Sequence, residues 1–166
     1  MSLSAQRNHT AGKKRLALIL MIFALVLMLV GCSADKAKNT AVQNADGSLT
    51  IPLSAFDDSV HFIDLSSNGT AMQLMTHKGI DGQPRLSWNT CQVCNGSPLA
   101  YFEFQGDQLI CKNCGNTFSK DTIGGSNQGC YPWAVSNYAV NQDSVTIPAD
   151  AVKEMAPYFT RWKKGL

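Results

Sequence analysis

Two Cys-x-x-Cys motifs near the middle of the chain carry the clearest chemistry in the sequence. One contains Cys91 and Cys94, the other contains Cys111 and Cys114, and sixteen residues lie between them. Four thiolates at this spacing can close a tetrahedral site around one metal ion. The motifs therefore predict a four-cysteine metal site, and their spacing fits zinc at least as well as iron.

The segment between the motifs must bring the four cysteines together. Residues 101–111 are rich in aromatic and apolar side chains and contain a turn signal at residues 105–107, which predicts a β-hairpin. A glycine closely follows each second cysteine, at Gly96 and Gly115. Glycine adopts a positive φ at little steric cost, so the backbone amides can turn toward the sulfur atoms. We expect a ribbon-like metal-knuckle hairpin.

Three interpretations of these cysteines remain open at this point. As ligands they would hold zinc or iron, as dithiol pairs they would exchange electrons, and as disulfides they would cross-link loops. A thioredoxin-type cysteine needs a helix N-terminus, where the dipole lowers its pKa, whereas these motifs precede turns and short strands. That difference favours metal ligands, although disulfides are permitted outside the cytoplasm.

The first residues have the pattern of a secretion signal. Basic side chains precede an unbroken apolar run at residues 16–30, which is shorter than the about 20 residues that a membrane span needs. The run ends at Gly31 and Cys32, a pair that resembles the lipobox of bacterial lipoproteins. We expect a signal peptide over residues 1–31 and a lipid on Cys32, with an uncleaved anchor as the alternative. Either arrangement holds the protein at the extracytoplasmic face of a membrane in the cell envelope.

The exported part divides into a tether and a domain. Residues 32–46 are small and polar, which predicts a lipid-anchored flexible tether, and residues 47–166 are long enough for a single domain. Without the signal peptide, ten Lys and Arg remain against twelve Asp and Glu, a formal charge of −2. Nucleic acid would require a concentrated basic face, so no nucleic-acid partner is expected.

With Cys32 carrying a lipid, Cys130 leaves an odd number of cysteines in the domain. An odd count in an exported protein indicates a reactive thiol, a fifth ligand or an intermolecular bond. The glycines around Cys130 allow close approach to the other cysteines. We therefore regard Cys130 as a candidate fifth ligand, with a buried, inert thiol as the alternative.

The domain is predicted to be mainly β, a small α+β fold with the knuckle hairpin inside an antiparallel β domain and a short C-terminal helix. Alternating apolar patterns bounded by turn signals predict strands at residues 48–51, 60–65, 70–77, 84–88 and 144–147. Residues 149–162 have an amphipathic helical pattern in which Asp150 can serve as the N-cap. Pro157 falls inside this pattern and is expected to kink or split the helix.

The remaining side chains with chemical potential form no recognisable catalytic motif. No nucleophile lies in a pattern with a base, so the sequence identifies no enzymatic activity. Met75 and His77 share one face of the predicted strand while Met72 lies on the other, which argues against a second metal site. Core methionines and surface histidines, at His61 and His77, are expected instead.

The cysteine motifs occur in a fixed order with other short motifs. After the two Cys-x-x-Cys pairs come Thr122-Ile-Gly-Gly125, Gly129-Cys130-Tyr-Pro132 and Val145-Thr-Ile-Pro148. In this order, residues from about 47 to 160 resemble the FtrD-like family of membrane-associated iron-sulfur proteins. The third cysteine element of that family is close to Gly-Gly-Cys-Asn-Pro, and here Gln128 and Tyr131 replace its first glycine and its asparagine.

The resemblance implies an extracytoplasmic metal-binding or iron-sulfur domain that accompanies iron uptake machinery and moves electrons for it. Iron or an iron-sulfur cluster would be the cofactor, with zinc as the alternative, and Cys130 would be a ligand or a neighbour of the centre. Many relatives carry the domain within a multispan membrane protein. In this protein, partner proteins in the membrane would have to supply the metal transport or the electron transfer.

Overall fold

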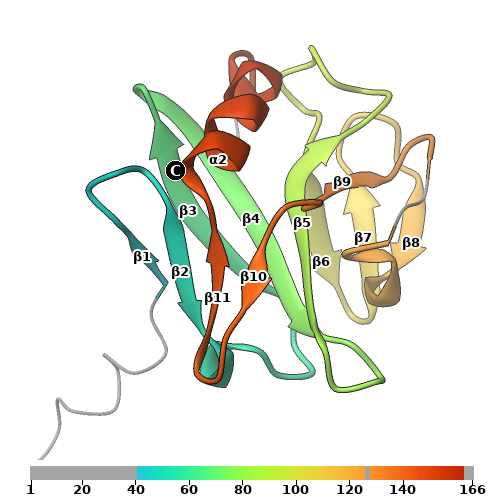
Figure 1. The fold of residues 1–166 in the computed structure, drawn as a ribbon. Helices are drawn as coiled ribbons and strands as arrows, with labels where there is room; N and C mark the ends of the chain where they lie inside the picture. Colours follow the sequence, from blue (N-terminus) through green and yellow to red (C-terminus); the bar gives the residue numbers. More distant parts are fainter. Residues whose placement is uncertain (1–40, 126–127, 163–166) are drawn as a thin grey trace, which may run out of the picture. The chain divides into compact units, whose positions relative to one another are not determined.

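The computed structural model describes residues 41–125 and 128–162. These residues form a mainly antiparallel β structure with three sheets and one short C-terminal α-helix, as expected (Figure 1). The predicted signal peptide, Cys32 and most of the predicted tether lie outside the described residues. No helix among the described residues is long and apolar enough to cross a membrane.

The first sheet contains four strands in the order β1-β2-β11-β10. Their bounds are Val42–Gln43, Leu49–Pro52, Ser144–Ile147 and Ala139–Val140 for β1, β2, β11 and β10. The two predicted strands β2 and β11 pair antiparallel, with Thr50 opposite Thr146. Strand β1 lies within the segment predicted to be a flexible tether, so the ordered sheet begins before residue 47.

The second sheet contains β3, β4, β5 and β9 in that order. Their bounds are His61–Ser67, Thr70–Lys78, Pro84–Cys91 and Pro132–Ala134. Strand β5 runs three residues beyond its predicted end and finishes at the first knuckle cysteine, Cys91. A register shift between Trp88 and Cys91 marks the place where β9 joins this strand.

The third sheet is the predicted hairpin extended by one strand. Its strands β6, β7 and β8 span Phe102–Gln105, Gln108–Cys111 and Thr117–Ser119. Gln105 pairs with Gln108 across the turn, where the sequence places Gly106 and Asp107. The second knuckle cysteine pair therefore begins at the last residue of β7, as the first begins at the last residue of β5.

Two apolar cores lie on the two faces of the second sheet. The first is shared with the β2-β11 sheet and with the C-terminal segment, and includes Ile51, Leu74 and Trp88. The second lies toward the hairpin sheet and includes Met75, Phe102 and Cys111. Because both faces of β4 are covered, its buried residues run continuously from Met72 to His77 instead of alternating.

The C-terminal segment divides at the predicted place. Helix α2 covers Ala149–Met155, and a 3₁₀ helix, η4, follows at Ala156–Phe159 around Pro157. The expected cap at Asp150 is wrong, because the N-cap residue is Pro148 and Asp150 lies inside the first turn. Phe159 and Trp162 then pack edge-on at 5.4 Å and close the first core.

A buried asparagine connects the second sheet to the hairpin sheet. The Asn89 amide donates to the Gln73 Oε1 at 2.7 Å and accepts from the Phe102 backbone N–H at 2.7 Å. Its backbone carbonyl accepts from the Trp162 indole N–H at 2.9 Å. Asn89 is fully buried two residues before Cys91, so these bonds hold the end of β5 against the start of β6.

Replacing this asparagine should destabilise the domain. We expect Asn89→Ala to lower the free energy of unfolding by about 2–4 kcal/mol, because buried polar partners in Gln73 and Phe102 lose their hydrogen bonds. Urea unfolding followed by tryptophan fluorescence measures the change. The control is Asn141→Ala, which replaces an exposed asparagine and should stay within about 0.5 kcal/mol of the parent. Equal stability of both variants would contradict the role of Asn89.

Candidate metal centre

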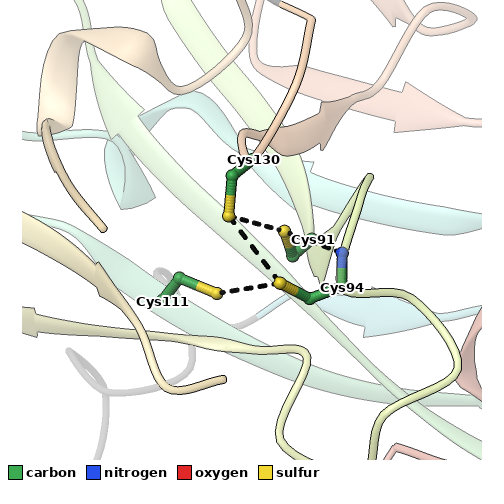
Figure 2. Close-up of side chains that lie close together, drawn as sticks. All are labelled: Cys91, Cys94, Cys111 and Cys130. Carbon is green, nitrogen blue, oxygen red and sulfur yellow. Dashed lines mark hydrogen bonds between the residues drawn. The ribbon is translucent and has the colours of Figure 1, made fainter. Parts of the chain in front are cut away.

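Four thiol groups from three separate segments converge at one point beside the hairpin sheet. Figure 2 shows the sulfur atoms of Cys91, Cys94, Cys111 and Cys130 directed toward one another. All four lie within 4.8 Å of one another. Cys130 Sγ is 3.2 Å from Cys91 Sγ and 3.8 Å from Cys94 Sγ, and Cys94 Sγ is 3.9 Å from Cys111 Sγ.

The first knuckle is built on the end of β5. The Cys91 N–H donates to the Ala100 carbonyl at 3.0 Å, which fixes the cysteine against the chain that enters the hairpin. The Cys94 N–H turns back toward Cys91 Sγ at 3.4 Å. Gly96 follows with φ of +95°, so the tight turn predicted from the glycine is present.

The second knuckle repeats this geometry at the end of β7. The Cys111 N–H donates to the Asn116 carbonyl at 2.9 Å, and the backbone N–H groups of Asn113 and Cys114 donate to the Cys111 sulfur. Gly115 follows with φ of +76°. Each knuckle therefore directs backbone donors at its first cysteine, an arrangement that stabilises a thiolate there.

Cys130 reaches the cluster because the chain after it pairs with β5. Pro132 lies opposite Cys91 in the β5–β9 ladder, and the Gln92 N–H donates to the Tyr131 carbonyl at 3.0 Å. The Tyr131 ring packs on Phe118 of β8, with 4.4 Å between the ring centroids. Tyr131 therefore joins the Cys130 segment to both neighbouring sheets.

The fifth cysteine of the domain, Cys114, lies at the solvent side of this cluster. Its side chain is exposed, whereas Cys91 and Cys111 are fully buried and Cys94 and Cys130 are half-buried. Cys114 Sγ nevertheless contacts Cys130 Sγ at 2.8 Å. The structure thus brings all five candidate ligands together. The four sulfur atoms within 4.8 Å of one another include Cys130, whereas the spacing of the motifs predicted Cys114 as the fourth ligand.

The spacing of the sulfur atoms fits a single metal ion. With metal–sulfur bonds of about 2.3 Å, neighbouring thiolates of a tetrahedral site lie about 3.8 Å apart. The contacts of 3.2, 3.8 and 3.9 Å bracket this value. An iron-sulfur cluster uses the same donors, but its bridging sulfides separate thiolates on different irons, so the inner cysteines would have to move apart to hold one.

Burial sets the ionisation of these thiols. It raises the pKa of Cys111 to about 12 and also raises the pKa values of Cys94 and Cys130. The hydrogen bond with Cys130 lowers the pKa of the exposed Cys114 to about 7. Inner thiolates therefore need a compensating cation, and a bound metal ion would displace their protons.

The two histidines in the described part of the chain, His61 and His77, do not belong to the cysteine cluster. His61 Nε2 contacts Asp57 Oδ1 at 2.7 Å on the surface. The prediction of a surface position is wrong for His77, which is fully buried near the end of β4, a strand with apolar cores on both faces. Burial lowers the pKa of His77, and neither ring nitrogen has a hydrogen-bond partner among the described residues.

Sequence reasoning missed the positions that hold the knuckles in place. Asn89 belongs to no recognisable motif. Its role in joining the two sheets is visible only from its buried position in β5. The glycines before Cys130 and Pro132 after it gave a partial indication that Cys130 lies close to the other cysteines. Its pairing with Cys91 is a long-range contact that the sequence did not indicate.

The fold and the cluster define a cysteine-rich, mainly antiparallel β domain with the donor set of a metal site. A family model described as "Membrane iron-sulfur containing protein FtrD-like" matches residues 56–159, which is more than half of the chain. The chain belongs to this family, as the order of its motifs predicted. No curated protein and no solved structure matches it.

A glycine in the segment that leads to Cys130 lies against the backbone of β5. Gly124 has φ of +74° and donates its N–H to Ser87 Oγ at 2.8 Å. A Cβ at this position would lie 3.2 Å from the Leu86 nitrogen and 3.4 Å from the Arg85 Cα. This close approach fixes the position of Gly124, from which the chain continues toward Cys130.

We expect Gly124→Ala to lower the free energy of unfolding by about 1–2 kcal/mol through backbone strain and by about 1–3 kcal/mol more through the steric contact. Gly82→Ala is the matched control, because Gly82 has φ of +76° with no atom within 4 Å of the added Cβ. Urea unfolding and competitive metal titration measure both variants. Equal loss of stability and metal affinity in the two would contradict the structural role of Gly124.

Proposed function

We propose that this protein binds iron through its cysteine cluster and serves iron transport or electron transfer at a membrane, as a lipoprotein of the extracytoplasmic face. Its family supports the link to iron and to membranes. The cluster supports the binding of a metal, because thiolate donors suit iron and zinc and exclude the hard cations that prefer oxygen.

One observation carries the proposal. Three segments that are far apart in the sequence place four sulfur atoms within 4.8 Å of one another, although burial makes thiolates unfavourable there. Packing alone does not require thiols to converge, and a bound cation would stabilise the arrangement. The residues proposed to hold the metal are Cys91, Cys94, Cys111 and Cys130, with Cys114 beside them.

At this site the protein would position the thiolate ligands and exclude water from them. Backbone N–H groups at the first cysteine of each knuckle stabilise thiolate charge, and the buried positions of Cys91 and Cys111 keep solvent from the inner side. Iron held by thiolates supplies one-electron chemistry at a potential set by such hydrogen bonds and by burial. Zinc in the same position would instead stabilise the fold without redox activity.

A thiol-disulfide protein is the second candidate. The contact between Cys114 and Cys130 and the lowered pKa of Cys114 favour it. Neither Cys-x-x-Cys motif begins a helix, since each starts at the last residue of a strand, so the dipole that activates thioredoxin-type cysteines is missing there. A zinc-stabilised interaction module is the third alternative and uses the same donors.

The metal content of the full chain tests the proposal. Protein purified without oxygen should contain about one iron per chain and absorb in the visible range through thiolate charge transfer. Cys111→Ser should lower metal affinity by more than about 100-fold, because loss of a ligand exceeds the 10–100-fold effect of changes around a ligand. Elemental analysis and absorption spectra report both quantities.

The control for this experiment is Ala139→Ser, which adds the same hydroxyl at an exposed position of β10. It should keep the metal. One colourless zinc per chain would move the function to the zinc-stabilised module. Disulfides with no metal in the parent protein would refute the metal site and support the thiol-disulfide candidate.

The lipid anchor has its own test. If cleavage follows Gly31, the mature parent should begin at Cys32 and carry the mass of a lipid there, and Cys32→Ser should lack that lipid mass. Mass spectrometry of the mature N-terminus and fractionation measure this change. An unprocessed N-terminus that stays in the membrane in both proteins would show an uncleaved anchor instead.

A further inference from the structure

The cluster offers one more thiol than a tetrahedral metal ion can use. Four sulfur atoms form the inner group, and the fifth, from Cys114, contacts Cys130 Sγ at 2.8 Å. Structural four-cysteine sites are closed by four ligands and need no spare thiol. The extra cysteine therefore calls for a physical explanation.

The five thiols differ in how firmly they are held and how deeply they lie. Cys91 and Cys111 are the last residues of β5 and β7, and both are fully buried. Cys94 lies within the first knuckle, where its N–H is directed at Cys91 Sγ. Cys130 lies outside any strand and is half-buried, whereas Cys114 is exposed. The exposed Cys114 therefore contacts a half-buried thiol, Cys130, whose backbone belongs to neither knuckle.

We propose that Cys114 and Cys130 alternate as the fourth ligand of one divalent metal ion, and that the exposed Cys114 passes this ion to and from an external ligand. Cys91, Cys94 and Cys111 keep their positions during the exchange. This inference rests on the proposed metal-binding function and treats the ion as cargo. The external ligand would be a thiolate or imidazole group of a partner protein, which are the donors that compete with cysteine for such ions.

The exchange conserves atoms and charge. The Cys114 thiol transfers its proton to the Cys130 thiolate across their contact, Cys114 forms a bond to the ion, and Cys130 releases its bond. Four thiolates are bound before and after, and the ion stays divalent, so the step needs no oxidant or reductant. Zinc in catalytic sites can expand to five ligands, and the same expansion here would let the incoming thiolate bind before the other leaves.

The transfer rate of zinc from the full chain tests this exchange. The protein is loaded with one equivalent of zinc without oxygen and mixed with excess 4-(2-pyridylazo)resorcinol, whose absorbance reports the zinc it receives. We expect Cys114→Ser to keep one zinc per chain and to transfer it about tenfold more slowly, equivalent to about 1.4 kcal/mol of barrier. We expect Cys130→Ser also to keep one zinc, held through Cys114, and to transfer it faster than the parent.

A parent-like transfer rate in Cys114→Ser would overturn the inference. So would loss of zinc from Cys114→Ser together with unchanged zinc in Cys130→Ser, because Cys114 would then be a fixed ligand. If the parent chain binds neither zinc nor iron, both the metal-binding function and the exchange fail. If it binds zinc and all three proteins transfer it equally, only the exchange fails.

A second measurement requires no substitution. Zinc-loaded parent protein is treated briefly with N-ethylmaleimide, and the labelled cysteines are identified by mass spectrometry. Exchange predicts labels on both Cys114 and Cys130, since each is free for part of the time, and protection of Cys91, Cys94 and Cys111. Labelling of Cys114 alone would show that Cys130 is a permanent ligand and would overturn the exchange.

Discussion

The convergence of thiol groups is the constraint on which the rest of the structure depends. The sulfur atoms of Cys91 and Cys130 lie 3.2 Å apart in a partly buried space, where thiolate charge is unfavourable without a cation. Strands β5 and β7 both end at the cluster, and their last residues, Cys91 and Cys111, are two of its cysteines. The short strand β9 pairs with β5 and thereby carries Cys130 to the same point.

The second sheet holds this arrangement together because it is covered on both faces. One face shares a core with the β2-β11 sheet and the C-terminal segment, and the other contacts the hairpin sheet. Three short strands such as β6, β7 and β8 gain stability from packing against another element. Asn89 adds directional hydrogen bonds to that contact, so the two knuckles keep a fixed separation.

Local patterns predicted much of the fold. The strands around residues 48–51, 70–77 and 144–147, the hairpin and the division of the last helix before Pro157 all depend on side chains close in sequence. The predictions failed where a contact with residues distant in the sequence decided the burial or the secondary structure of a segment. His77 is buried because other elements pack on both faces of β4, and residues 42–43 form the strand β1 because they pair with β2.

The sequence by itself determined the donor type, the two knuckles and the family, because thiol chemistry, the Cys-x-x-Cys spacing and the glycines that follow are local properties. Tertiary structure alone decided which sulfur atoms meet. Cys130 joins Cys91 through strand pairing across about forty residues, and Cys114 stays at the solvent side although it belongs to a motif. Such contacts depend on the free energy of packing the whole domain, which no short pattern encodes.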